Sequence, residues 1–281
     1  MKQILVPTDF SANAYTALLY VTKLYGDEPV QFFLLHSFAN QVSALTSRVD
    51  IGKSEKVLDE LYDQADTEGT RFIAKLREKV QNDLHTFEVI STSMSLVRAA
   101  NKLISDRGIQ LVVMGTKGRT AAEDVLLGSN TIAVVRKIEK APLLIVPTDL
   151  NFLVPTEIAF ATDFNDVFPT AGMTPVLDLV RAHQATLHVV HVGAKSDLGT
   201  RQQEHLQRIE ATLRDVQSQF HWLGRDGSIA RTIDSFMIDE GMDMLTMVYR
   251  KRNIIEQWFR EAVVKRVGQH TSIPYLVVPI Q

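Results

Sequence analysis

Two short stretches in the first half of the chain have the residue types that a phosphate site requires. Residues 114–119 read Met-Gly-Thr-Lys-Gly-Arg, and nine residues separate Gly118 from the Gly-Ser-Asn-Thr stretch at 128–131. Glycine lets the backbone approach an anion closely. A helix-like run follows Gly128, and the first amides and the positive dipole end of such a helix would attract phosphate. The spacing therefore predicts phosphate binding, with an ordinary turn and a glycine cap as the alternative.

Asp9 is a second candidate ligand. It follows the apolar run Ile4–Val6 and the pair Pro7-Thr8, and it precedes a helix-like segment. An Asp-x-Ser sequence before a helix is also a capping pattern. Ligand contact and helix capping are both expected of Asp9, and the two roles are compatible.

The corresponding stretch of the second half has lost the glycines. Val248, Lys251 and either Arg260 or Glu261 stand where the first half has Gly residues. Their side chains occupy the space that a phosphate needs, and an acidic group there would repel it. We therefore predict that this half has no such site. The basic cluster at 250–252 fits a solvated loop, with another anion or the domain interface as alternatives.

Three histidines of the second half, His183, His188 and His191, resemble a metal-binding cluster at first sight. His188 and His191 lie three residues apart on a predicted strand and therefore face opposite sides of the sheet. His191 also repeats His36 of the first half, which favours a shared structural role over a metal site. No P-loop, G-x-S-x-G elbow or H-E-x-x-H motif occurs. We assign no catalytic residue and no metal ligand.

These residues lie on a chain that repeats itself. Residues 4–10 and 158–164 both end in Thr-Asp-Phe, at an offset of 163 − 9 = 154, and both halves close on an apolar run between prolines, 141–147 and 273–279. A repeat of this length indicates a duplicated domain. We place the first domain at 1–149 and the second at 150–281.

The second copy is shorter than the first. The offset falls from 191 − 36 = 155 at the second strand to 247 − 114 = 133 at the fourth, so the second copy lacks about 22 residues between them. The extra segment of the first copy lies around Asn40–Gln64. It could close over a ligand as a lid, or it is a surface loop that leads into a helix.

Each copy alternates short apolar runs with helical patterns. The predicted strands of the first copy are Ile4–Val6, Phe32–Leu35, Thr86–Ile90, Leu111–Met114 and Leu143–Val146, and its clearest helices are Ala14–Leu24 and Leu96–Ile104. Nearly continuous hydrophobicity is typical of strands covered on both faces. We predict an α/β fold of two Rossmann-like domains, each a five-stranded, mainly parallel sheet with helices on both faces. Ligands then sit at the carboxyl ends of the strands.

Composition limits the possible partners. A net charge of −3 and a pI near 6.2 do not favour nonspecific electrostatic binding to nucleic acid or to an anionic membrane. The absence of cysteine excludes disulfides, thiolate metal sites and cysteine nucleophiles. The run Ile4–Val6 is too short for a signal-peptide core, and no window has about 18 apolar residues. We expect a soluble, cytoplasmic protein.

The G-x-x-G, nine residues, G-[S/T] pattern resembles the nucleotide-binding motif of the universal stress protein family. The opening strand with its Asp-bearing loop, the Leu34–His36 strand, the stretch 113–116 and the Pro142–Pro147 ending also resemble that family. Both halves are covered, so the chain is identified as a tandem member. The resemblance implies that the halves pack as single-domain members do in their dimers, with Leu143–Val146 and Tyr275–Val278 as the seam. A homodimer of the chain is compatible with this, and no protein partner is indicated.

The resemblance also implies ATP as ligand, with or without Mg²⁺, bound once per chain in the first half. Its implied contacts run from the adenine and ribose to the phosphates: Pro7, Thr8, Asp9, Ser37, Met114, Gly115, Gly118, Gly128, Ser129 and Asn130. The main hypothesis is a nucleotide binder in a stress response with little or no catalysis. Slow ATP hydrolysis or self-phosphorylation at Ser129 or Thr131 is one alternative, for which only Asp9, Glu123 and Asp124 are candidate bases. A pure interaction protein without nucleotide is the other.

Overall fold

The computed structural model describes residues 1–46, 51–116, 128–138, 140–148, 150, 154–165, 170–249 and 273–279. The chain divides into two compact units, Met1–Thr148 and Asp149–Gln281. No helix within these described ranges is both long enough and apolar enough to cross a membrane.

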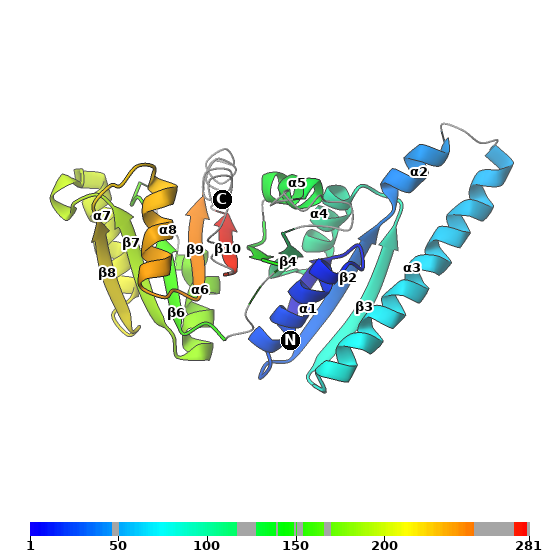
Figure 1. The fold of residues 1–281 in the computed structure, drawn as a ribbon, viewed down its shortest axis with the longest axis horizontal. Coiled ribbons are helices and arrows are strands. Elements are labelled where there is room, and N and C mark those ends of the chain that lie inside the picture. The colour runs from blue at the N-terminus through cyan, green and yellow to red at the C-terminus, as the bar shows by residue number, and fades with distance from the viewer. Residues whose placement is uncertain are drawn as a thin grey trace. The chain divides into compact units, whose positions relative to one another are not determined.

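The first unit alternates strands and helices along the chain (Figure 1). Its elements are β1 (Lys2–Pro7), α1 (Ala12–Leu24), β2 (Val30–Ser37), α2 (Ala39–Thr46), α3 (Ile51–Lys79), β3 (His85–Thr92), α4 (Leu96–Arg107), β4 (Leu111–Gly115), α5 (Ser129–Lys137) and β5 (Leu143–Val146). The strand order is β3-β2-β1-β4-β5, and neighbouring strands run parallel.

The second unit repeats this plan. Its elements are β6 (Glu157–Ala161), α6 (Thr170–His183), β7 (Thr186–Val192), the 3₁₀ turn η1 (Lys195–Asp197), α7 (Thr200–Thr212), β8 (Ser218–Leu223), α8 (Ile229–Asp239), β9 (Met244–Tyr249) and β10 (Tyr275–Pro279). The order β10-β9-β6-β7-β8 is again parallel throughout. The predicted parallel α/β fold is confirmed.

The direction of the crossovers places the helices of the first unit on both faces of its sheet. The connections through α1 and α3 step from β1 towards β3, whereas those through α4 and α5 step the opposite way. Right-handed crossovers put helices on opposite faces when the stepping direction reverses. In agreement, α1 contacts α3, and α4 contacts α5. The reversal makes the boundary between β1 and β4 the switch point, where such sheets bind ligands.

The helices begin and end where local residues satisfy the backbone. The side chain of Ser11 accepts a hydrogen bond from the amide of Ala14 and caps α1. Gly108 ends α4 with φ of 63°, a left-handed conformation that glycine adopts at no steric cost. The predicted cores of both helices are confirmed, with a few more residues at their ends.

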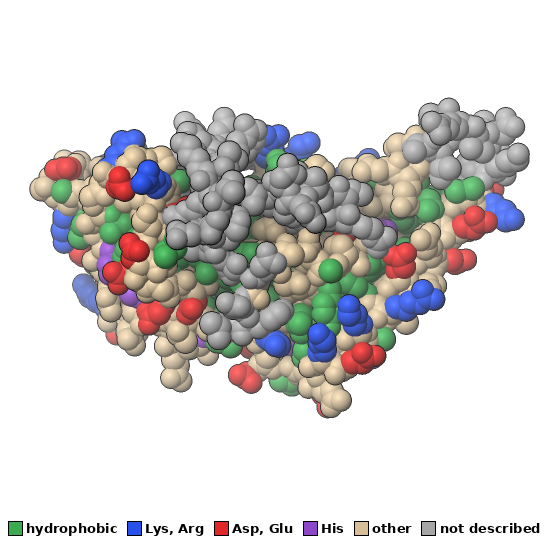
Figure 2. Space-filling model, viewed as in Figure 1, with side chains coloured by type: hydrophobic (Ala, Val, Ile, Leu, Met, Phe, Trp, Pro, Cys, Tyr) green, Lys and Arg blue, Asp and Glu red, His purple; other side chains and the backbone are tan. Residues whose placement is uncertain are grey.

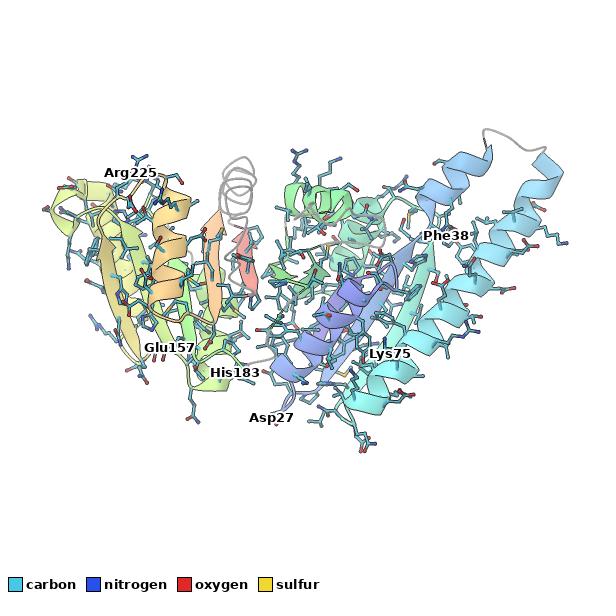
Figure 3. The ribbon with its side chains drawn as sticks, viewed as in Figure 1. Asp27, Phe38, Lys75, Glu157, His183 and Arg225 are labelled. Carbon is cyan, nitrogen blue, oxygen red and sulfur yellow. The ribbon has the colours of Figure 1, made fainter. Side chains whose placement is uncertain are left out.

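The described residues of the extra segment around 40–64 are helical rather than an irregular loop. They form α2 and the beginning of α3, a helix of 29 residues. Phe38, just after β2 (labelled in Figure 3), anchors it through an edge-to-face contact with Tyr62, with ring centroids 4.8 Å apart. Both acidic and basic side chains are visible over α3 (Figure 2). Its predicted action as a lid stays a prediction.

Candidate functional site

The switch point of the first unit brings the two main predicted stretches to one edge of the sheet. β1 ends at Pro7 and pairs with β4, which ends at Gly115. α1 starts a few residues after β1, and α5 is the helix that follows β4. Helix N-termini leave amides without intrahelical partners and carry partial positive charge. This edge therefore has the electrostatic character that an anion requires.

Gly115 is required by packing at this edge. A Cβ atom on it would lie 2.9 Å from the carbonyl oxygen of Asn13 and 3.1 Å from that residue's carbonyl carbon. Because the neighbour is backbone in the first turn of α1, it cannot move aside cheaply. The glycine lets the start of α1 lie directly against the end of β4.

The start of α5 is tied to the same strand end. The amide of Gly128 donates to the carbonyl oxygen of Thr116 at 2.8 Å, and the hydroxyl of Thr131 donates to the carbonyl oxygen of Gly115 at 3.0 Å. Thr131 is 2% exposed, whereas Ser129 and Asn130 are exposed. Gly115 and Gly128, two of the predicted glycine positions, thus lie close together. Ser129 and Asn130, two of the predicted phosphate contacts, are exposed to solvent. The Thr131 hydroxyl is engaged inside the fold.

Part of the predicted loop lies outside the described residues. Lys117, Gly118 and Arg119 fall there, and so do Glu123 and Asp124. Met114 is buried in β4, so its side chain belongs to the core.

The Thr-Asp-Phe turn after β1 is held by its own side chains. The hydroxyl of Thr8 accepts a bond from the amide of Phe10 at 2.9 Å, and Asp9 Oδ1 accepts one from the amide of Ser11 at 3.1 Å. Phe10 adopts φ of 57°, which is uncommon for a non-glycine residue. Asp9 thus braces the turn, while the N-cap of α1 is Ser11.

His36 and Ser37 fasten the end of β2 to this turn. Nδ1 of His36 lies 2.9 Å from the carbonyl oxygen of Thr8, and the ring stacks on Phe10 with centroids 4.8 Å apart. Since a carbonyl can only accept, Nδ1 carries the proton. The Ser37 hydroxyl donates to the carbonyl oxygen of Met94 at 2.7 Å, so only its backbone could face a ligand.

The second unit contains the same turn. Thr162 Oγ1 accepts from the amide of Phe164 at 3.0 Å, and Asp163 Oδ1 accepts from the amide of Asn165 at 2.9 Å. Phe164 has φ of 56°. Nδ1 of His191 lies 2.9 Å from the carbonyl oxygen of Thr162. The shared structural role predicted for His36 and His191 is confirmed.

The second turn is also covered by α7, a feature that motif reading missed. The Gln202 amide donates to the carbonyl oxygen of Asp163 at 2.7 Å, and Nδ1 of His205 donates to that of Phe164 at 2.8 Å. His205 is 3% exposed. Its burial could have been suspected only from its spacing of four residues to the apolar Ile209, which places both on one face of a helix.

The strand registers identify Val248 as the counterpart of Gly115. Leu5 pairs with Val112 in the first unit and Ala159 with Leu245 in the second, and both differences, 248 − 115 and 245 − 112, equal 133. The basic cluster at 250–252 lies outside the described residues.

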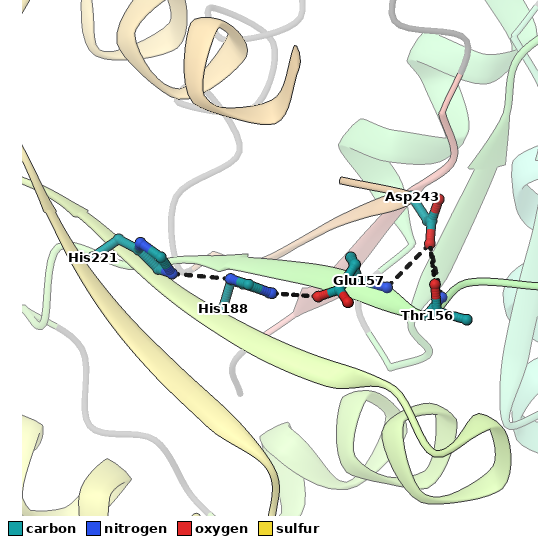
Figure 4. Close-up of polar contacts among 5 residues, drawn as sticks. All are labelled: Thr156, Glu157, His188, His221 and Asp243. Carbon is teal, nitrogen blue, oxygen red and sulfur yellow. Dashed lines mark hydrogen bonds and ion pairs between the residues drawn. The ribbon is translucent and has the colours of Figure 1, made fainter. Parts of the chain in front are cut away.

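The second unit also carries a chain of polar contacts that the motifs did not reveal. His188 lies between Glu157 and His221 (Figure 4). His191 instead bonds the carbonyl oxygen of Thr162, on the other side of the strand. This confirms that His188 and His191 face opposite ways. Within the described part of the chain, no group of three or more His, Asp or Glu side chains is arranged to hold a metal ion.

Comparison with known sequences agrees with the duplicated architecture. Residues 1–147 and 157–279 each match the sequence model of the Universal stress protein family. Universal stress protein MJ0577 of Methanocaldococcus jannaschii is 27% identical over 154 residues, which cover 52% of this chain and 94% of that protein. Universal stress protein YxiE of Bacillus subtilis is 25% identical over 142 residues, covering 50% and 92%.

Solved structures share the fold over both units. A universal stress protein from Archaeoglobus fulgidus superposes with a TM-score of 0.68 at 19% identity, covering 99% of this chain and 98% of that one. Protein PA1789 from Pseudomonas aeruginosa gives a TM-score of 0.57 at 15% identity, covering 99% and 92%.

Proposed function

The chain belongs to the universal stress protein family as a tandem member, and we propose that it binds one adenine nucleotide, ATP, in its first unit. The site is the carboxyl edge of the sheet between β1 and β4. The second unit has a structural or regulatory role. The family resemblance indicates the adenine nucleotide, and the geometry of the edge supports a phosphate there.

The observation that carries this proposal is the close approach of two helix starts to one glycine strand end. The carbonyl oxygen of Asn13, in the first turn of α1, lies 2.9 Å from the position that a Cβ atom on Gly115 would take. The Thr131 hydroxyl, in the first turn of α5, donates a hydrogen bond to the carbonyl oxygen of the same glycine. Two N-terminal dipole ends directed at one point favour a group with several negative charges. The triphosphate of ATP is such a group.

The proposed contacts divide along the nucleotide. Pro7, Thr8 and Asp9 border the adenine and ribose, with the backbone of Ser37 beside the base. Met114 and Gly115 line the approach to the phosphates through their backbone, and Gly118, Gly128, Ser129 and Asn130 cradle them. Any Mg²⁺ would be bound through the phosphates of the nucleotide.

Binding without turnover is favoured over enzymatic hydrolysis. Self-phosphorylation needs an accessible hydroxyl, and that of Thr131 is engaged with the carbonyl oxygen of Gly115. Ser129 remains as the exposed hydroxyl at the start of α5. Asp9, a candidate base, braces the turn after β1 through the amide of Ser11.

A carboxylate at the start of α5 tests the site without breaking the fold. Ser129→Asp adds negative charge where the helix dipole favours it, so stability should hold or rise by about 0.3–1 kcal/mol. The same charge should repel the phosphates and weaken ATP binding at least about tenfold, since each 1.4 kcal/mol is a factor of ten. Titration calorimetry with Mg²⁺-ATP measures affinity and stoichiometry, and thermal unfolding measures stability.

Ser228→Asp is the matched control, because Ser228 is the N-cap of α8 in the second unit. It should leave affinity unchanged, and the wild type should bind one nucleotide per chain. Unchanged affinity in Ser129→Asp, or a stoichiometry of two, would overturn the assignment.

A further inference from the structure

Three side chains on neighbouring strands of the second unit form a continuous hydrogen-bonded chain (Figure 4). Nε2 of His188 lies 2.5 Å from Glu157 Oε2, and Nδ1 of His188 lies 2.9 Å from Nε2 of His221. The two imidazole rings stack with centroids 5.1 Å apart and an interplanar angle of 26°. Asp243 holds the start of β6 in place by accepting bonds from the amides of Thr156 and Glu157.

The three residues share one face of the sheet. Ala159, two residues after Glu157, pairs with His188, and Val190, two residues after His188, pairs with His221. Side chains two apart on a strand point to the same side, and paired positions do likewise. α8 contacts β7, and its Phe236 ring lies 4.7 Å from that of His221. His221 therefore lies between the sheet and α8, with His188 beside it on the same face and Glu157 partly exposed at the far end of the chain.

The first unit has no such chain at these positions. The repeat offsets of 154 and 155 place Gln3 and Phe33 opposite Glu157 and His188. Ser91 and Trp222 hold equivalent places beside His36 and His191, so Ile90 corresponds to His221. Phe33 is 1% exposed and lies under the guanidinium of Arg107 at the end of α4. A buried phenylalanine in contact with a guanidinium of α4 is thus replaced by histidines in the second unit.

The number of protons on this chain decides whether it can persist. With both rings neutral, His188 donates to the Glu157 carboxylate and accepts from His221. With one added proton on the pair, one of the two facing nitrogens still accepts, so both hydrogen bonds can persist. A second proton would set two N–H groups against each other across 2.9 Å, on rings of like charge. The doubly protonated pair must therefore separate.

The surroundings of His221 oppose its charged form. Burial, and then the proximity of His188, lower the pKa of His221 below its ordinary value of 6.5, and Glu240 at the end of α8 acts in the opposite direction. Glu157 on β6 and His188 on β7 complete the groups in the hydrogen-bonded chain. Asp234 is a buried carboxylate of α8, and Asp243 lies at the Glu157 backbone.

We propose that Glu157, His188 and His221 form an acid-sensitive latch across β6, β7 and β8, which supports the packing of Phe236 of α8 on His221 and loosens when the histidine pair carries two added protons. A group whose pKa is lower in the folded state binds its proton more readily in the open state. The latch therefore stabilises the folded state fully above pH 6.5. This stabilisation declines as the pH falls below that value.

The first unit supplies an internal reference for the test. Amide hydrogen exchange, corrected for intrinsic rates, should be followed by mass spectrometry at pH 7.5 and pH 5 in α8 and in α4. Protection of α8 should fall by a larger factor than protection of α4, because the lowered pKa of His221 makes its protonation favour the open state. Equal losses in the two helices would overturn the proposal.

Two variants separate the latch from general acid effects. His221→Gln keeps an amide that can donate to His188 but cannot be charged, so the selective loss in α8 should disappear. The double variant H188F/H221I copies the first unit and should behave in the same way. His205→Gln removes another buried histidine of this unit and should leave the acid response intact. Persistence of the response in His221→Gln would contradict the latch.

Discussion

The two units build the same turn after their first strand but surround it differently. In both, Thr and Asp side chains brace the turn, Phe adopts positive φ, and a histidine on the next strand bonds the Thr carbonyl. In the first unit the neighbouring strand ends in Gly115. In the second unit the corresponding strand has Val248 at this position. Gln202 and His205 donate hydrogen bonds to the carbonyl oxygens of the turn.

This comparison separates scaffold from ligand site. Because the second unit keeps the Thr-Asp-Phe turn and its histidine where the glycines are gone, these residues are needed by the fold whether or not a ligand binds. The difference seen in the described residues isolates one feature that we attribute to phosphate, the glycine at the end of β4. Asp9 is consequently part of a structural turn first and a proposed nucleotide contact second.

The largest expected effect comes from giving the first unit the side chain of the second. In Gly115→Val the new Cβ meets the Asn13 carbonyl oxygen at 2.9 Å. Overpacking against backbone should lower the free energy of unfolding of this unit by about 3 kcal/mol and abolish ATP binding. Urea unfolding followed by circular dichroism, with calorimetry for ATP, measures both.

Val248→Ala is the counterpart in the second unit. It should leave ATP binding in the first unit intact and create no second site, because Gln202 and His205 still cover the turn. Wild-type stability in Gly115→Val would show that α1 does not depend on this close approach.

A smaller loss of stability, equal in the two units, is expected when the histidine that both units share is removed. His36→Ala and His191→Ala each leave a Thr carbonyl oxygen without its partner, which costs about 2 kcal/mol. Both tryptophans, Trp222 and Trp258, lie in the second half, so their fluorescence reports that unit, while circular dichroism reports the whole chain. Asn at either position can donate to the carbonyl and should restore part of the loss. A loss of stability from only one of the two substitutions would mean that the turns are not equivalent.

The smallest effect is expected at the covering helix of the second unit. Gln202→Ala removes an exposed hydrogen bond to the Asp163 carbonyl oxygen and should lower the free energy of unfolding by about 1 kcal/mol or less. Thermal unfolding detects this. Gln203→Ala on the same helix, which removes a bond to the Leu198 carbonyl oxygen, is the control and should leave the Asp163 turn unchanged. ATP stoichiometry should stay at one, and a rise to two would show that α7 alone blocks the second site.

Much of the fold could be read from the sequence because it rests on local patterns. The short apolar runs gave the strands, since a strand buried on both faces has few polar positions. The repeat of Thr-Asp-Phe and of the histidine located equivalent turns in both copies. The segment 40–64 was harder, because its polar start hid the helical pattern that α2 and α3 follow.

The candidate site was predicted less completely. Gly115 was singled out for anion approach, but its contact with Asn13 joins residues about a hundred positions apart, which spacing cannot reveal. Thr131 was proposed as an available hydroxyl, yet it bonds the Gly115 carbonyl oxygen. For the same reason the chain from Glu157 through His188 to His221 escaped notice: it crosses three strands.

The sequence by itself determined the duplication, the parallel α/β plan and the half of the chain that keeps its glycines. These follow from residue type and order, which set strand propensity, burial and backbone freedom. Only the tertiary structure decided which side chains are engaged. Register and crossover direction place Gly115 against Asn13 and His188 between Glu157 and His221, because hydrogen bonds depend on distances that no linear spacing fixes.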